Sequence, residues 1–236
     1  MLECRHVFKK FDGKMVVKDC NFSVQKGEII GLMGESGSGK STLAKLLIGL
    51  EKPSQGQVLL DGQPYSVKKS GVRILLVFQD SLHSVNPHFT VEQVLTEALP
   101  KDVAREEVEA ILEDVSLDKS YLNQPARQLS GGQLQRICIA RGLLLKPDIL
   151  IFDEALSGLD PIVQGRLLRL LYDLWEKYQL TYLFISHDFK LSYALCHRIL
   201  VMADGEIVDE IKDFELPIQA HHPVTKKLIG DKAHFS

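Results

Sequence analysis

The sequence predicts an α/β protein with a mostly parallel central sheet, antiparallel strands near the N-terminus and an inserted helical segment. Two short apolar runs, Ile149–Phe152 and Tyr182–Ile185, are typical of strands that are buried on both faces. Between them, leucines recur at helical spacing from Leu167 to Leu174. Strands that alternate with helices favour a parallel sheet.

The first third of the chain is rich in strand patterns. Cys20, Phe22 and Val24 alternate with polar residues, as in a half-buried antiparallel strand. We expect strands over Leu2–Phe8, Val16–Val24, Glu28–Met33, Gln57–Leu60 and Arg73–Phe78.

The middle of the chain has a different periodicity. Apolar residues recur at helical spacing from Val108 to Val115, and acidic residues fill many of the other positions. We therefore expect the segment from about Val91 to Lys146 to be mainly helical. The predicted organisation is one domain, 1–236, with residues 85–146 as a helical subdomain. Residues 1–84 and 147–236 then form the core and its β subdomain.

Composition limits the possible classes of protein. The 236 residues are 45% hydrophobic and 25% charged, as in ordinary globular proteins, and the net charge of −3 argues against a general nucleic-acid surface. No apolar run approaches the roughly 18 residues of a membrane span, and the first residues lack the apolar stretch of a signal peptide. The four cysteines are scattered, so we expect buried, reduced thiols in a cytosolic protein; a metal site is the alternative.

A phosphate-binding motif occupies Gly34–Thr42, which reads GESGSGKST and matches G-x-x-x-x-G-K-[ST]. Its glycines let the backbone curl so that N–H groups point inward and form an anion nest. Lys40 can reach the β- and γ-phosphates, and the Ser41 hydroxyl can bind Mg²⁺. The alternative is a Gly/Ser-rich surface turn. The apolar run before the motif and the helical pattern after it favour the phosphate site.

Two acids end the apolar run that begins at Ile149. In a parallel sheet the carboxyl ends of the strands form the ligand crevice, so Asp153 would lie beside the phosphate loop and hold Mg²⁺. Glu154 would orient or deprotonate the attacking water. The alternative is an acidic turn or helix cap, which the phosphate loop makes less favourable.

A third motif, Leu129–Gln133, reads LSGGQ and opens a helical pattern. Ser130, Gly131 and Gly132 at a helix start would form a second anion site, although a Ser N-cap alone is the alternative. The run LSGGQ-x-QR lies after the phosphate loop and before the acidic strand. With its motifs in this order, the sequence resembles the nucleotide-binding subunits of ATP-binding-cassette (ABC) transporters over nearly the whole chain. The resemblance implies a P-loop NTPase (RecA-like) core that binds ATP with Mg²⁺.

The resemblance also assigns roles to isolated residues. Gln79 resembles the residue that contacts Mg²⁺ and the membrane subunit, and His187 resembles the one that contacts the γ-phosphate. Asp160 resembles the acid that contacts the partner ATPase, but before Pro161 it could equally cap a helix. Phe11 occupies the position of an adenine-stacking aromatic, usually Tyr, with a place in the core as the alternative.

The predicted site therefore has three groups of residues. The catalytic group is Lys40, Glu154 and His187, and the metal ligands are Ser41, Gln79 and Asp153. The nucleotide-binding group comprises Phe11, Gly34, Glu35, Ser36, Gly37, Ser38, Gly39, Lys40, Ser41, Thr42, Gln79, Ser130, Gly131, Gly132, Gln133 and Asp160. The resemblance implies that two chains, identical or paralogous, close head-to-tail around two ATP molecules.

Two further segments resemble one subfamily. Phe78–Val91 is similar to the FQDP-x-x-SLNP-x-x-TV run of ATPases that drive import of peptides and nickel, and His222–Leu228 is similar to their HPYT-x-x-L segment. This implies an importer of nickel, another metal or a metallophore, or alternatively of oligopeptides or dipeptides. The adjacent His221 and His222 are too few to form a metal-ligand set.

The implied partners are transmembrane permease subunits, a second ATPase subunit and, indirectly, an extracytoplasmic solute-binding protein, with no nucleic acid. The implied location is the cytoplasmic face of the cell membrane. Three rival classes are a non-transport ABC ATPase, a GTPase or small-molecule kinase, and a nucleotide-gated scaffold without activity. The signature motif and the absence of Asn-Lys-x-Asp argue against the second, and Glu154 and His187 against the third.

Overall fold

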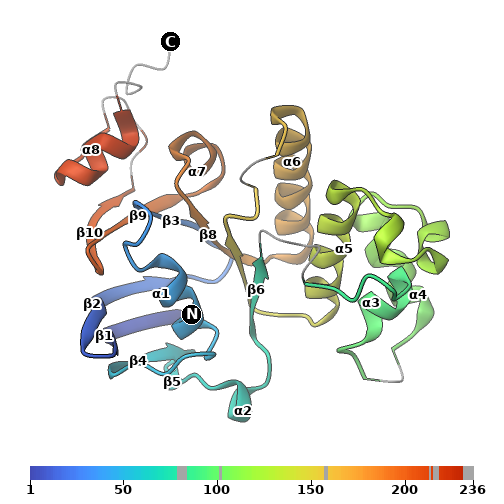
Figure 1. Cartoon of the computed structure of the whole chain (residues 1–236), viewed down its shortest axis with the longest axis horizontal. Helices are drawn as coiled ribbons and strands as arrows, with labels where there is room; N and C mark the ends of the chain where they lie inside the picture. The colour runs from blue at the N-terminus through green and yellow to red at the C-terminus, as the bar shows by residue number, and fades with distance from the viewer. Residues whose placement is uncertain (79–83, 101–102, 157–158, 213, 215–217, 231–236) are drawn as a thin grey trace.

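A computed structural model describes residues 1–78, 84–100, 103–156, 159–212, 214 and 218–230 (Figure 1). Its described strands form a six-stranded sheet in the order β10-β9-β3-β8-β7-β6 and a four-stranded sheet in the order β2-β1-β4-β5. The strands of the larger sheet are β3 (Ile29–Met33), β6 (Ile74–Phe78), β7 (Ile149–Asp153), β8 (Thr181–Ser186), β9 (Arg198–Ala203) and β10 (Glu206–Ile211). All of its neighbours pair in parallel except β9 and β10. The predicted mostly parallel sheet is confirmed.

Alternate residues of the central strands belong to two hydrophobic cores, one on each face of the sheet. Leu150 and Phe152 pack into one core, while Ile149 and Ile151 pack into the other. The first core contains the Phe152 ring stacked on Phe184 at a centroid distance of 4.6 Å. Both faces are covered, so the central strands are apolar at successive positions, as the sequence indicated.

The smaller sheet is antiparallel and packs with the second core. Its strands are β1 (Leu2–Phe11), β2 (Lys14–Val24), β4 (Gln55–Leu60) and β5 (Gln63–Pro64). Asp-Gly pairs with positive φ at both positions turn the β1–β2, β4–β5 and β9–β10 hairpins. The right-handed twist of the two strands in a hairpin suits such a two-residue turn. The β9–β10 hairpin was not predicted, although its Asp204-Gly205 turn is visible in the sequence.

The described elements between Val91 and Leu144 are all helical, in agreement with the expectation for this segment. They are α3 (Val91–Thr96), α4 (Arg105–Asp114), the short 3₁₀ helices η1 (Lys119–Asn123) and η2 (Ala126–Gln128), and α5 (Gly131–Leu144). The remaining helices are α1 (Lys40–Leu47), α2 (Val67–Ser70), α6 (Pro161–Tyr178), α7 (Phe189–Leu195) and α8 (Pro223–Ile229). Figure 1 shows α3, α4 and α5 together on the right, across the sheet from α1.

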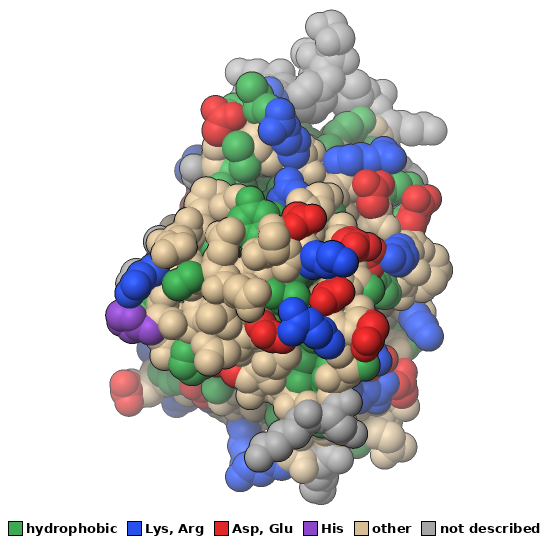
Figure 2. All heavy atoms as spheres, turned by 90° about the vertical axis from the view of Figure 1, so that its right-hand side faces the viewer, with side chains coloured by type: hydrophobic (Ala, Val, Ile, Leu, Met, Phe, Trp, Pro, Cys, Tyr) green, Lys and Arg blue, Asp and Glu red, His purple; other side chains and the backbone are tan. Residues whose placement is uncertain are grey.

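The surface and the cysteines match an ordinary globular chain. Figure 2 shows the face on the side of α3 and α4, where acidic and basic side chains lie interspersed and are not segregated by sign. All four cysteines are buried, and no disulfide joins any of them within the part of the chain that the structure describes. Among the helices that the structure describes, none is both long and apolar enough to cross a membrane.

Candidate nucleotide site

The register of the parallel strands brings the phosphate loop, the Asp153–Glu154 pair and His187 to one edge of the sheet. Met33, which precedes the phosphate loop, pairs with Ser186, which precedes His187. Asp153 pairs with Ile185 on one side and with Phe78 on the other. The carboxyl ends of β3, β8, β7 and β6 are therefore level, as required for a shared ligand crevice. Gln79, next after Phe78, lies outside the described residues.

The phosphate loop connects β3 to α1, and neighbouring backbone packs closely against it. A Cβ at Gly39, where φ is +107°, would lie 2.8 Å from the Val16 carbonyl oxygen and 2.9 Å from the Met202 methyl. No larger residue fits there without displacing the backbone. The unpredicted β9–β10 turn braces the loop, because Gly205 N–H donates to the Ser38 carbonyl at 3.0 Å.

Lys40 is held inside this loop. Its ammonium donates to the carbonyls of Gly34 and Glu35, each at 2.8 Å, and the residue is only 7% exposed. Burial lowers the pKa of Lys40, and the carboxylates of Glu154 and Asp153 partly oppose this. The basic group and both acids are thus electrostatically coupled at one edge of the sheet.

The loop also contains a buried hydroxyl that lacks a partner. Ser38 is 6% exposed, and its Oγ makes no hydrogen bond to any residue that the structure describes. A buried hydroxyl without a hydrogen-bond partner is unusual and destabilises the folded state. A phosphate oxygen in the loop would give it an acceptor. The cradle therefore fits the triphosphate of ATP by its orphan hydroxyl, its glycine geometry and its lysine.

Asp153 and Ser41 form the candidate metal position. Burial raises the pKa of Asp153, opposed by a hydrogen bond from the Ser41 side chain. A carboxylate beside a hydroxyl is an all-oxygen donor set, which suits a hard cation such as Mg²⁺. The structure therefore brings Asp153 and Ser41 into contact.

Glu154 and His187 are in direct contact. The Glu154 Oε1 lies 3.3 Å from the His187 Nδ1, and the two side chains are 33% and 60% exposed. Glu154 adopts φ +51°, and its N–H donates to the Ile185 carbonyl at 2.9 Å. The pair is accessible to solvent and lies at the edge defined by Asp153. A water molecule between them and the phosphate loop would meet an acceptor and a possible proton carrier.

The C-terminal helix α8 adds a contact that the sequence did not predict. The Lys227 ammonium pairs with the Glu35 carboxylate of the phosphate loop at 2.6 Å. This hydrogen bond lowers the pKa of Glu35 and raises that of Lys227. The His222 Nδ1 accepts from Val224 N–H and so caps α8. His222 therefore has a local structural role.

Asp209 of β10 anchors α8. Its carboxylate accepts from the Thr225 hydroxyl and from the His222 N–H, the latter at 2.8 Å. Partial burial raises the pKa of Asp209, but the hydrogen bonds from Thr225 and from the backbone of His222 and His221 outweigh this and the pKa is lowered. The segment His222–Thr225, which reads HPVT, is thus held to β10 by one partly buried acid.

We expect Asp209→Ala to weaken the docking of α8 by about 1–3 kcal/mol, because it leaves the Thr225 hydroxyl and an amide without their acceptor. Hydrogen exchange of the α8 amides measures this local opening, and Asp173→Ala on the exposed face of α6 is the control. Because the pKa of Asp209 is lower in the folded protein, its ionised carboxylate stabilises the docked helix fully at pH values above the unfolded pKa of about 3.9. This stabilisation is lost as the pH falls through the folded pKa, so the effect of the substitution should shrink below about pH 4. Unchanged α8 exchange at pH 7 would contradict this role.

The signature residues begin α5, away from the phosphate loop. Ser130 caps the helix by accepting from Gln133 N–H at 3.3 Å, and Gln133 Oε1 accepts from Ser130 N–H at 2.8 Å. Figure 1 shows α5 and α1 on opposite sides of β6. The structure therefore does not bring Ser130, Gly131 and Gly132 to Lys40 within this chain.

Two other predicted residues have visible local roles. Asp160 caps α6 by accepting from Ile162 N–H at 2.9 Å, which is the capping alternative; a contact with a partner could coexist with it. Phe11 is 40% exposed at the end of β1, so it does not fill the core, and Lys9 lies 4.7 Å from its ring centroid. The Phe11 side chain is therefore partly exposed, with the Lys9 ammonium over its ring.

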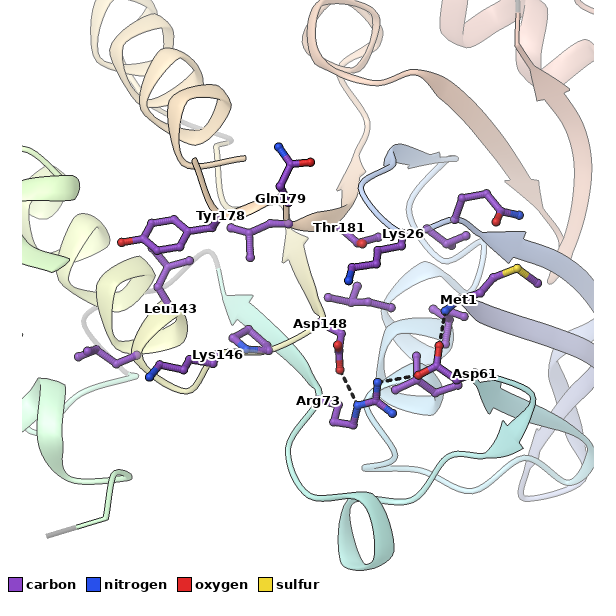
Figure 3. Close-up of a pocket in the computed structure, with 18 of the residues that line it drawn as sticks. Met1, Lys26, Asp61, Arg73, Leu143, Lys146, Asp148, Tyr178, Gln179 and Thr181 are labelled. Carbon is purple, nitrogen blue, oxygen red and sulfur yellow. Dashed lines mark hydrogen bonds and ion pairs between the residues drawn. The ribbon is translucent and has the colours of Figure 1, made fainter. Parts of the chain in front are cut away.

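A cavity of about 590 Å³ is a separate feature. It is lined by Ile149 and Thr181, which begin β7 and β8, so it lies at the opposite end of the sheet from the phosphate loop. Figure 3 shows Arg73 bridging Asp148 and Asp61 beside it. Its position excludes it as the nucleotide site.

Comparison with known proteins agrees with this geometry. A sequence profile described as "ABC transporter" matches residues 17–157. The metal-staphylopine import system ATP-binding protein CntF of Staphylococcus aureus is 38% identical, over 98% of this chain and 94% of its own. The nickel import ATP-binding protein NikE of Escherichia coli K12 is 41% identical, over 84% of this chain and 80% of its own.

Solved structures give the same result. The protein cbiO1 from Clostridium perfringens, part of the ABC transporter complex cbiONQ, has a TM-score of 0.82 and 26% identity, over 98% of this chain and 91% of its own. A dimeric post-hydrolysis state of the cassette MJ0796, bound to ADP and Pi, has a TM-score of 0.75 and 27% identity, over 90% of this chain and 98% of its own. The predicted fold class is confirmed.

Proposed function

The chain belongs to the ABC transporter family, as an ATPase subunit of the importer class, and we propose that it powers the uptake of nickel or another metal, free or bound to a metallophore. The names of CntF and NikE support metal over peptide cargo. The observation that carries the proposal is the convergence of the phosphate loop, Asp153, Glu154 and His187 at one edge of the sheet.

We propose the following roles within the site. Lys40 and the amides of Gly34–Thr42 bind the triphosphate, and Ser41, Asp153 and Gln79 hold Mg²⁺, which would neutralise charge that develops on the phosphates. Glu154 orients the attacking water and accepts its proton. His187, 3.3 Å from Glu154, faces the γ-phosphate. Phe11 stacks on adenine through its exposed ring.

The separation of the signature motif from the phosphate loop supports a two-chain site. A second ATPase subunit, identical or paralogous, supplies its Ser130–Gln133 equivalent to each nucleotide, and Asp160 lies at that interface. The dimeric structure of MJ0796 is a precedent for the assembly. The division into a core and a helical subdomain over 85–146 suits this arrangement, because each part contributes to a different nucleotide.

The remaining partners follow from the importer role. Transmembrane permease subunits bind the chain at the cytoplasmic face of the membrane, and an extracytoplasmic solute-binding protein delivers the cargo to them. The mixed charge on the face in Figure 2 and the net charge of −3 support the expectation of no nucleic-acid partner.

The proposal is tested by co-expressing the chain with candidate permease subunits and a partner ATPase from the same organism, purifying the complex and reconstituting it in vesicles. We expect co-purification and ATP-dependent uptake of radioactive nickel, with or without a metallophore, when the cognate binding protein is present. The Glu154→Gln complex is the matched control and should assemble without transport. Uptake of peptides alone would support the peptide-importer alternative, and failure to bind permeases would support a non-transport ATPase.

A further inference from the structure

Two glutamine side chains hold the backbone that follows Glu154. The Gln135 amide, on α5, donates to the Ala155 carbonyl, and the Gln164 amide, on α6, donates to the Leu156 carbonyl at 3.1 Å. Gln135 is only 4% exposed, and Ala155 and Leu156 are similarly buried. Two successive carbonyls are therefore fixed by donors from two different helices.

These contacts matter because Glu154 has an unfavourable backbone conformation. Its φ of +51° lies in the left-handed region, which costs a non-glycine residue of order 1 kcal/mol or more and persists only where neighbouring contacts impose it. The hydrogen bond from Glu154 N–H to Ile185 fixes one side of the residue. The Gln135 and Gln164 amides fix the other side.

The origin of Gln135 connects two parts of the predicted machinery. It lies in the second turn of α5, the helix that begins at the signature residues Gly131 and Gly132. A helix moves as a rigid element, so a displacement at the start of α5 is passed to Gln135 and to the Ala155 carbonyl. The contacts of the signature motif and the placement of Glu154 are thereby linked within one chain.

We propose that Gln135 and Gln164 are positioning residues that set the direction of the Glu154 carboxylate for hydrolysis. This inference rests on the proposed role of Glu154 as the group that activates water. Neither glutamine side chain is expected to contact the phosphates of the nucleotide. Their loss should therefore affect the chemical step and leave nucleotide binding intact.

The first test replaces Gln135 with Met, which keeps the length and apolar packing but removes the donor. We expect kcat for ATP hydrolysis to fall about three- to tenfold, with KM and nucleotide affinity little changed. Gln164→Met, at a less buried position, should lower kcat in the same way. It provides the test if Gln135→Met does not fold. Gln57→Met, on the exposed side of β4, is the matched control. A normal kcat in both folded variants would overturn the inference.

A double-mutant cycle separates positioning from general structural damage. If Gln135 acts through Glu154, then Gln135→Met should cause no further loss in the Glu154→Gln background, whereas a structural effect would be additive. An additive loss overturns the inference even when Glu154 is essential. If Glu154→Gln alone leaves hydrolysis normal, the proposed function of Glu154 fails, and this result is distinguishable from failure of the glutamine contacts.

Discussion

Glu154→Gln is expected to reduce steady-state ATP hydrolysis by on the order of a hundredfold or more, which corresponds to about 2.7 kcal/mol of activation free energy. The amide keeps the shape of the side chain but cannot accept a proton from water. The contact with His187 Nδ1 at 3.3 Å should persist in altered form, so the backbone and the fold are expected to remain unchanged. The measurement is phosphate release at saturating ATP and Mg²⁺, with the complete transporter.

The control for this variant is Glu113→Gln, an exposed glutamate on α4 that lies outside the site. It should hydrolyse ATP at the normal rate. Nucleotide binding to the Glu154→Gln protein should be retained or strengthened, because cleavage no longer removes the γ-phosphate. Near-normal turnover by Glu154→Gln would refute the assignment of the base.

Lys40→Ala is expected to weaken ATP binding roughly ten- to hundredfold, as for the loss of a charged hydrogen bond worth about 1.5–3 kcal/mol. The ammonium lies inside the loop, where the proposed triphosphate would bind. Its removal also leaves the carbonyls of Gly34 and Glu35 without their donors, so the loop itself should lose order. The measurement is equilibrium titration with ATP and Mg²⁺.

Lys52→Ala, at an exposed lysine that lies outside the motif, is the matched control and should bind ATP normally. Thermal unfolding of Lys40→Ala without nucleotide separates a loss of loop order from a loss of charge. An ATP affinity equal to that of the unchanged protein would exclude the phosphate-binding role of Lys40.

The sequence was most informative where local pattern and tertiary structure coincide. The strands of the larger sheet before residue 186 were predicted because their apolar runs are buried on both faces, and the phosphate loop because its glycines and Lys40 form a local motif. The sequence analysis did not predict β9 and β10, although the Asp204-Gly205 turn between them is a recognisable hairpin signal. The missed hairpin is part of the site, because Gly205 N–H donates a hydrogen bond to the phosphate loop.

Contacts between remote segments could not be predicted from one sequence. Lys227 meets Glu35 across 192 positions, and no periodicity or motif joins them. Gln135 was visible within LSGGQ-x-QR, but its direction depends on how α5 packs beside the end of β7. The Phe11 position shows the same limit, because only the structure distinguishes an exposed ring from a core residue.

The two hydrogen bonds from Lys40 to its own loop have a consequence for nucleotide binding. An ammonium has three N–H donors, so one remains for an incoming anion while two keep the long side chain in place. Ordering a buried lysine costs about 1.5–2 kcal/mol of rotamer entropy, and here that loss is incurred once, as the polypeptide folds. In the proposed role of Lys40, each successive nucleotide would therefore meet a side chain that is already ordered, and its binding would not incur this entropy loss again.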